Sequence, residues 1–151
     1  MIQFDLEDAN FLDLFAGSGQ MGLEAVSRGA EKAHLIDKSS EAVDIIRANA
    51  EKTRLADKCS IFCTDSTDYL KRSKGRCKFD FVFIDPPYGS GLVQESLRLL
   101  ADGTLLNDNA WLIVEDETDD IFAGDEELAS RFNIEKSNRY GRVHIVVLSL
   151  K

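Results

Sequence analysis

The stretch LDLFAGSGQMG, residues 12–22, decides the fold class predicted for this chain. Its apolar first half is typical of a buried strand, and Gly17, Gly19 and Gly22 then follow with the spacing G-x-G-x-x-G at the start of a helical pattern. Glycines let backbone N–H groups approach a ligand closely, and a helix N-terminus adds positive partial charge. The stretch therefore predicts a strand, a ligand-binding loop and a helix, and it leaves open whether the ligand is NAD or S-adenosylmethionine (AdoMet), since both contain an adenosine.

On both sides of this stretch, apolar segments of strand length alternate with helical patterns. Such alternation is typical of βαβ units and a mostly parallel sheet. In the first helix, Met21, Ala25 and Val26 are expected to share the buried face. The expected strands are 10–15, 33–37, 59–63, 79–84 and 110–115, and the expected helices are 20–28, 40–53 and 92–101.

The tail, residues 131–150, breaks this rhythm, because two strand-like runs flank SNRYG with no room for a helix between them. That pattern predicts an antiparallel hairpin. Parallel strands closed by a hairpin are similar to the Rossmann-like, seven-stranded sheet of the class I AdoMet-dependent methyltransferases rather than to the parallel sheet of a dehydrogenase. We therefore expect an α/β fold of this kind, in a single domain over residues 1–151.

Composition is that of an ordinary globular chain, with 44% hydrophobic and 30% charged residues. The net charge of -9 argues against a protein that binds phosphates over its whole surface. A local basic run, residues 71–78, precedes the fourth strand and is either solvated surface or a landing site for a polyanion beside the end of that strand. No bilayer-length apolar run and no secretion-signal pattern occurs, so we expect a cytoplasmic, monomeric protein without membrane contact.

Metal binding is not expected from the cysteine pattern. Cys59 and Cys63 flank a strand-like run, where small buried thiols are commoner than metal ligands. Only His34 and His144 could complete a zinc site, and both lie in strand-like runs of their own.

Three acids follow three consecutive strands. Asp37, 20 residues after Gly17, is placed to accept hydrogen bonds from ribose hydroxyls. Asp65 could hold an adenine amino group, and the carboxylate of Asp13 suits an ammonium and a sulfonium better than a pyrophosphate. Each acid alone could equally be an N-cap or turn residue, but three together favour AdoMet over NAD.

The fourth strand ends in FIDPPYGSG, residues 83–91. An exocyclic amine of guanine or adenine is a poor nucleophile, because its lone pair is delocalised, and it needs acceptors aimed at its N–H bonds. Asp85 and the carbonyl of Pro86 can supply two acceptors, held rigidly by the Pro86-Pro87 rings. Tyr88 offers a face on which a base can stack, and a base in a duplex would have to be flipped out to reach it.

The motifs DLFAGSG and DPPY resemble those of the amino-methyltransferases that act on exocyclic amines. The surrounding text, with the late NRYGRVHIVVLSL, resembles the bacterial family that methylates the N2 amine of a guanine in 16S ribosomal RNA, along nearly the whole chain. The resemblance implies AdoMet as cofactor and ribosomal RNA or the small ribosomal subunit as partner. It assigns the amine and base to Asp85, Pro86, Pro87 and Tyr88, and the cofactor to Asp13, Phe15, Gly17, Ser18, Gly19, Asp37, Lys38, Asp65 and Ser66.

Arg139 and Tyr140 match the family's RYG run but receive no chemical step. Family members usually carry a basic N-terminal segment before the first strand, and this chain is expected to lack it, which affects substrate binding more than cofactor binding. Three alternatives remain: an adenine-N6 DNA methyltransferase, for which the residues after Tyr88 leave no room for a target-recognition domain; a nicotinamide-dependent oxidoreductase, which would not explain DPPY; and an inactive domain that binds AdoMet or RNA.

Overall fold

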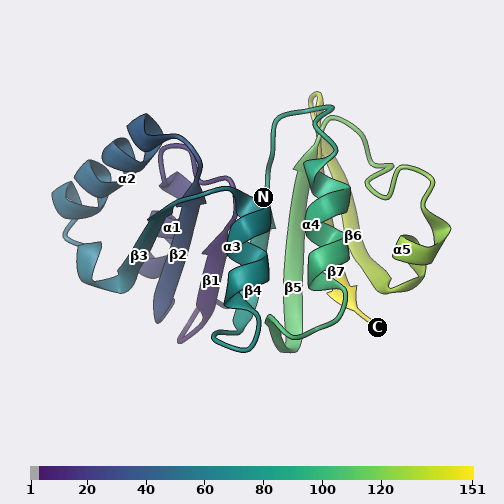
Figure 1. Ribbon diagram of the computed structural model, residues 1–151, viewed down its shortest axis with the longest axis horizontal. Helices are drawn as coiled ribbons and strands as arrows, with labels where there is room; N and C mark the ends of the chain where they lie inside the picture. The colour runs from purple at the N-terminus through teal and green to yellow at the C-terminus, as the bar shows by residue number, and fades with distance from the viewer. Residues whose placement is uncertain (1–3) are drawn as a thin grey trace.

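The computed structural model describes residues 4–151 and shows one seven-stranded sheet with helices on both faces (Figure 1). The strand order is β3-β2-β1-β4-β5-β7-β6, parallel from β3 to β5 and antiparallel where β7 joins β5 and β6. This order confirms the predicted class I methyltransferase fold. The strands are β1 Asn10–Asp13, β2 Lys32–Asp37, β3 Cys59–Cys63, β4 Phe79–Ile84, β5 Leu106–Asp116, β6 Phe132–Tyr140 and β7 Val143–Leu150.

The helices agree with the sequence pattern where that pattern is strong. Two were not predicted, α3 and α5, because α3 turns only Tyr69 and Leu70 as large apolar residues toward the core and α5 is little more than one turn. Ala25 and Val26 are buried as predicted, but Met21 is 43% exposed and Leu23 is buried in its place. The helices are α1 Gln20–Ser27, α2 Ser40–Lys52, the 3-10 turn Ala56–Lys58, α3 Ser66–Ser73, α4 Leu92–Leu100 and α5 Glu126–Ser130.

Two predicted strand limits were wrong. β1 ends at Asp13 rather than at residue 15, because the chain turns into the glycine loop there. β5 begins at Leu106 rather than at residue 110, pairing with Phe79 of β4 across a register shift. The polar residues 107–109, with Asn109 at φ 66°, hid this first part of the strand from an apolar pattern.

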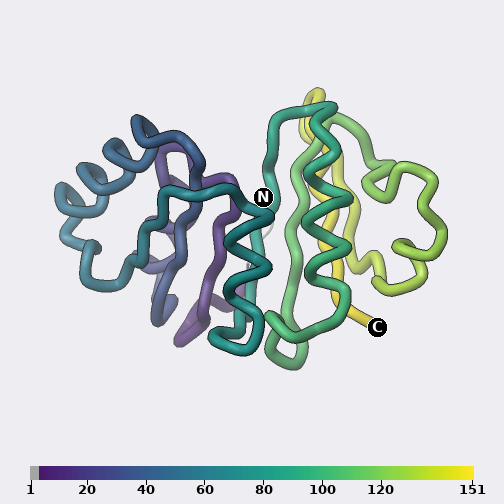
Figure 2. The backbone as a smooth tube through the Cα atoms, viewed as in Figure 1, coloured from purple at the N-terminus to yellow at the C-terminus, as the bar shows by residue number. Residues whose placement is uncertain are grey.

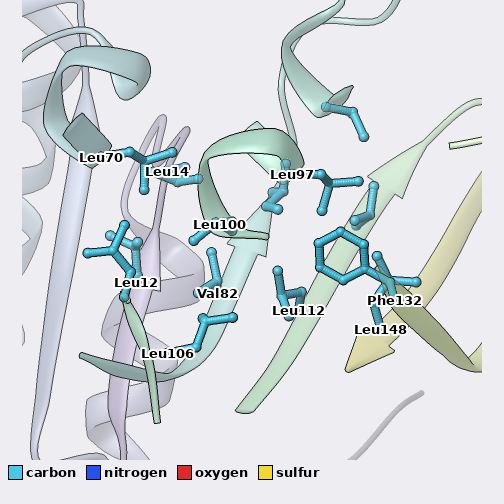
Figure 3. Close-up of a cluster of buried hydrophobic side chains, with 14 of the residues drawn as sticks. Leu12, Leu14, Leu70, Val82, Leu97, Leu100, Leu106, Leu112, Phe132 and Leu148 are labelled. Carbon is cyan, nitrogen blue, oxygen red and sulfur yellow. The ribbon is translucent and has the colours of Figure 1, made fainter. Parts of the chain in front are cut away.

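Each face of the sheet has its own hydrophobic cluster. On the face covered by α3, α4 and α5, Leu97 and Leu100 of α4 are fully buried and point toward Leu112 and Val82 of the sheet (Figure 3). Replacing one of these leucines with alanine would cost about 2–5 kcal/mol of stability. On the other face, α1 packs over the neighbouring strands β1 and β2, and Phe83 of β4 and Ile113 of β5, each 6% exposed, belong to the same cluster.

The carboxyl ends of the parallel strands meet along one edge of the sheet, at the top of Figure 2. The loops that follow β1, β2, β3 and β4 all lie there, which is where open α/β sheets bind ligands. The basic run 71–78 does not reach this edge, because α3 returns it to the start of β4 at the opposite edge. Of the two interpretations of this run, the structure therefore favours solvated surface over a polyanion site beside the end of β4, and Lys74 pairs with Asp102.

No helix within residues 4–151 has the length and apolar character needed to cross a membrane.

Candidate active site

A cavity of about 390 Å³ opens at the carboxyl edge between the loops after β1, β2 and β3 on one side and the DPPY corner on the other. Most of the predicted site residues line it, and Leu14 and Leu92, which were not predicted, add apolar walls. The predicted residues in the lining are Phe15, Gly17, Asp37, Lys38, Asp65, Ser66, Asp85, Pro86, Pro87 and Tyr88.

The glycine loop depends on left-handed backbone conformations and on a hydrogen bond from α2. Gly17 and Gly19 have φ of 57° and 84°, in the left-handed region that favours glycine. A Cβ on Gly22 would lie 2.6 Å from Leu35 Cδ2, so the third glycine allows α1 to pack against β2. Ser18 and Gly19 do not line the cavity: the Ser18 carbonyl accepts a hydrogen bond from Asn49 Nδ2 at 3.0 Å, and Gly19 is the N-cap residue of α1.

The carboxylates after β2 and β3 are both engaged by backbone donors. Asp37 Oδ2 accepts from Gly17 N at 3.0 Å and Oδ1 from Ser39 N at 2.9 Å. Asp65 caps α3, because its Oδ1 accepts from the backbone N–H groups of residues 67 and 68 at 2.9 and 3.2 Å. Each of these acids is thus a turn or cap residue, as the alternative interpretation expected, and each also lines the cavity.

Asp13 lies beneath the lining, directly before Leu14 and Phe15. It is 1% exposed, and its Oδ1 accepts no hydrogen bond from any residue between 4 and 151. Burial raises its pKa to about 7 against an opposing hydrogen bond from the Phe15 backbone, and the charges of Asp85 and Asp37 add to the increase. A buried carboxylate that lacks a donor on one of its oxygens is stabilised by a nearby cation.

Asp85, half-buried at the end of β4, faces a second carboxyl group that the sequence did not single out. Ile84 is in register with Val114, so the next residues, Asp85 and Glu115, lie side by side on adjacent strands. The pKa of Asp85 is raised to about 7, mainly by burial. The charge of Glu115, a hydrogen bond to Glu115 and the charge of Asp116 add to the increase, in that order. Asp85 therefore titrates near neutrality and can exchange a proton there.

The carbonyl groups of the two prolines at this corner differ in their hydrogen bonds. Pro86 is buried, and among residues 4–151 no N–H or O–H group donates to its carbonyl, whereas the Pro87 carbonyl accepts from Ser90 N at 3.3 Å. The ring of Tyr88 is 49% exposed at the mouth of the cavity. The corner thus presents a free carbonyl, a carboxyl group and an open aromatic face together.

The lining residues fit a cationic ligand better than an anionic one. Lys38 is the only basic side chain among the residues that line the cavity, against the carboxyl groups of Asp37, Asp65 and Asp85. A pyrophosphate would be repelled by this set, whereas the ammonium and sulfonium of AdoMet would be attracted. No group of three or more histidine, cysteine, aspartate or glutamate side chains within residues 4–151 has the arrangement of a metal site.

Comparison with known proteins gives a family for this site. A family model described as Conserved hypothetical protein 95 matches residues 1–149. The chain belongs to this family. Relatives in it carry a name that agrees with the resemblance predicted from DLFAGSG and DPPY, Ribosomal RNA small subunit methyltransferase D, and the prediction of the family is thereby confirmed.

One such relative, from Escherichia coli K12, is 38% identical over 112 residues, which are 74% of this chain and 55% of the relative. Another, from Haemophilus influenzae, is 31% identical over 115 residues, which are 76% of this chain and 60% of the relative. The chain thus spans less than two thirds of the length of these curated relatives.

Two solved structures superpose on nearly the whole chain. The proposed methyltransferase yhhF of Escherichia coli matches with a TM-score of 0.81 and 28% identity, over 97% of this chain and 77% of that one. A conserved protein of Streptococcus pyogenes matches with a TM-score of 0.83 and 30% identity, over 96% and 88%. The overall fold is therefore shared with these two proteins.

Proposed function

We propose that residues 1–151 form the catalytic domain of an AdoMet-dependent methyltransferase that modifies the N2 amine of a guanine in 16S ribosomal RNA. The observation that supports it most is the corner at Asp85, where a carboxyl group and the donor-free Pro86 carbonyl meet at the cavity. The names of the relatives support the choice of small-subunit ribosomal RNA. A substrate of this kind implies reaction in the cytoplasm.

The residues fit AdoMet. Asp37 would hold the ribose, Asp65 and Ser66 the adenine, and Phe15 with Gly17 the methionine end. The Asp13 carboxylate, whose Oδ1 has no donor among residues 4–151, would lie near the positive charges. When bound, AdoMet supplies a methyl group on a sulfonium. Lys38 lies beside Asp37 in the cavity wall, where its charge offsets part of the acidic field.

The chain's own residues position the amine and remove its proton. Asp85 and the Pro86 carbonyl accept the two N–H groups of the exocyclic amine, which directs the nitrogen lone pair at the methyl group. Tyr88 stacks on the guanine and fixes its plane. The N–C bond would form at the expense of the C–S bond of the methyl group, which leaves neutral S-adenosylhomocysteine. The amine would then be cationic, and Asp85, whose pKa burial raises to about 7, would accept the surplus proton.

Transfer of labelled methyl from AdoMet to small ribosomal subunits and to naked 16S RNA tests the proposal. Asp85→Ala should reduce the rate by at least about 10²–10³-fold, the cost of losing one preorganised polar group, while AdoMet affinity changes little. Asp85→Asn keeps an acceptor but cannot take the proton, so it should retain more activity than Asp85→Ala. Tighter binding of NAD than of AdoMet in calorimetry, or full transfer by Asp85→Ala, would contradict the proposal.

A further inference from the structure

The turn of the β6–β7 hairpin lies at the same edge of the sheet as the candidate active site. Asp116, the last residue of β5, is in register with His144 of β7, so the preceding residues 140–143 project past the carboxyl end of β5. Tyr140 and Val143 close the ladder, and the turn follows between them. Figure 1 shows this tip at the same end of the molecule as the loop from β4 to α4.

The tip is basic in a chain whose net charge is -9. Arg139 and Arg142 are exposed, and no carboxylate within residues 4–151 forms an ion pair with either. Arg139 Nε donates to the Gly141 carbonyl at 2.8 Å, which orders its guanidinium at the turn. Two arginines without acidic partners, at the edge that carries the site, provide charge for contacts with phosphates.

Tyr140 adds an aromatic face beside these charges. It is 43% exposed and, with Met21 at the start of α1, borders an apolar groove of about 530 Å³. Phe83 and Ile113 form the floor of this groove, and each precedes a carboxyl residue of the site, Asp85 or Glu115, by two positions on the same face of its strand. The groove therefore opens next to the place where the target amine would lie.

We propose that this tip is the RNA-binding element of the chain. Arg139 and Arg142 contact phosphates that flank the target guanine, and Tyr140 stacks an unpaired neighbouring base in the groove. The proposal rests on the proposed function and adds to it where the RNA lies. The combination of guanidinium groups with an open aromatic ring is the chemistry that recognises single-stranded RNA, whereas an apolar protein partner would not need the arginines.

The chain offers a matched control at the opposite edge of the sheet. Arg76 and Lys78 are also exposed, and they also form no ion pair among residues 4–151. They precede β4, whereas the site lies after it. The double variants Arg139→Gln/Arg142→Gln and Arg76→Gln/Lys78→Gln each remove two positive charges, from opposite edges of the sheet.

The experiment measures binding of a fluorescently labelled RNA stem-loop with unpaired loop guanines at several salt concentrations. The hairpin double variant should lower the slope of log affinity against log salt by roughly 1.4, since each phosphate contact to single-stranded RNA contributes about 0.7. Relative to about 1 M salt, where these contacts contribute little, a change of that size in the slope corresponds to about 25-fold weaker binding at about 0.1 M salt. The control double variant should leave both quantities near those of the unchanged protein.

Equal losses in the two double variants would mean that the RNA responds only to net charge, and this result would overturn the proposal. Absence of RNA binding by the unchanged protein would overturn it as well. So would binding that depends on the hairpin only in the presence of ribosomal proteins, because the tip would then recognise protein.

Tyr140 gives a second test that is independent of charge. Tyr140→Ala should weaken RNA binding by about 5- to 150-fold, the range for loss of one stacked base, while Tyr140→Phe, which keeps the ring, should bind like the unchanged protein. AdoMet binding, measured in parallel, should be the same in both. Equal RNA binding by Tyr140→Ala and Tyr140→Phe would remove stacking from the proposal.

These results can be separated from failure of the proposed function. If the unchanged protein binds RNA through the tip but transfers no methyl group, the methyltransferase proposal fails and the RNA-binding element stands. If methyl transfer depends on Asp85 but RNA affinity is insensitive to the tip, the reverse holds.

Discussion

The aspartates at the carboxyl edge fall into two pairs that differ in their hydrogen bonds. Asp37 and Asp65, after β2 and β3, accept backbone N–H groups and shape the loops around them. Asp13 and Asp85, at the ends of the central strands β1 and β4, lie near other carboxyl groups. Asp13 is buried and Asp85 half-buried, and the pKa of each is raised to about 7. The first pair is fixed by the fold itself, while the second is left for a ligand to stabilise.

This difference has a physical cause in the sheet. β1 and β4 are neighbours at its centre, so their ends bring Asp13 near Asp85, and Asp85 lies beside Glu115 of the next strand, β5. A carboxylate in such a position is destabilised by desolvation and by like charges, unless a cation or a hydrogen-bond donor arrives. The central pair therefore costs stability in the free protein and contributes binding energy to a cationic cofactor and an amine.

The largest effect is expected for Asp13→Asn. Because the folded-state pKa of Asp13, about 7, is above its ordinary value of 3.8, the native protein holds a proton that the unfolded chain has lost between these pH values. Wild-type stability therefore declines as pH rises through this window. Asparagine does not titrate, so the free energy of unfolding of Asp13→Asn, minus that of the wild type, should increase by about 2–3 kcal/mol between pH 5 and pH 8.

Urea denaturation at the two pH values measures this change. The same variant should bind AdoMet more weakly, because the neutral amide no longer attracts the cationic ligand. If this stability difference between variant and wild type does not depend on pH, the pKa of Asp13 is not raised, and the distinction between the two pairs of aspartates fails.

A smaller effect is expected for the outer pair. Asp65→Ala should destabilise the protein by about 1 kcal/mol at neutral pH, because it removes the N-cap of α3. Asp65→Asn retains the cap, so its stability should be close to that of the unchanged protein while its affinity for AdoMet falls. Melting temperatures measure the stability of the two variants, and calorimetry measures their affinity for AdoMet. Equal stability of Asp65→Ala and Asp65→Asn would show that the N-cap hydrogen bonds of Asp65 do not stabilise α3.

The smallest effect is expected for Glu115→Gln. The Glu115 charge ranks after burial among the causes that raise the pKa of Asp85. Its removal should therefore shift the acidic limb of the kcat/KM profile to lower pH, since a lower pKa leaves Asp85 ionised at lower pH. Glu117→Gln, on the same side of the site but farther along the chain, serves as the control and should shift the limb less.

Much of the fold could be predicted from the sequence. The order of strands and helices, the hairpin and the family followed from apolar periodicity and from two local motifs, because such patterns are set by neighbouring residues. Helix α3 was missed because its apolar residues, Tyr69 and Leu70, are too few for a periodic signal. Met21 was misplaced because the buried face of α1 depends on what covers β4 and β5, which no local pattern contains.

The candidate site was predicted in its residues more than in their neighbours. The motifs named the acids and the DPPY corner, but not Glu115, which stands beside Asp85 only because β5 pairs with β4 in one register. One signal for Glu115 was available in the sequence, because it follows the buried Ile113 of β5 by two positions and so lies on the same face of that strand. The location of the basic run could also have been deduced, since residues before a parallel strand lie at the edge opposite to those after it.

The sequence by itself determined the chemical groups of this protein: a glycine loop, acids after successive strands and a rigid acceptor corner. The tertiary structure alone decided which acids have donors, which face one another, and that the arginine-tipped hairpin shares their edge while the basic run does not. The reason is that strand order and register come from pairing between distant segments. The pKa values of Asp13 and Asp85, and with them the chemistry of the site, depend on that pairing.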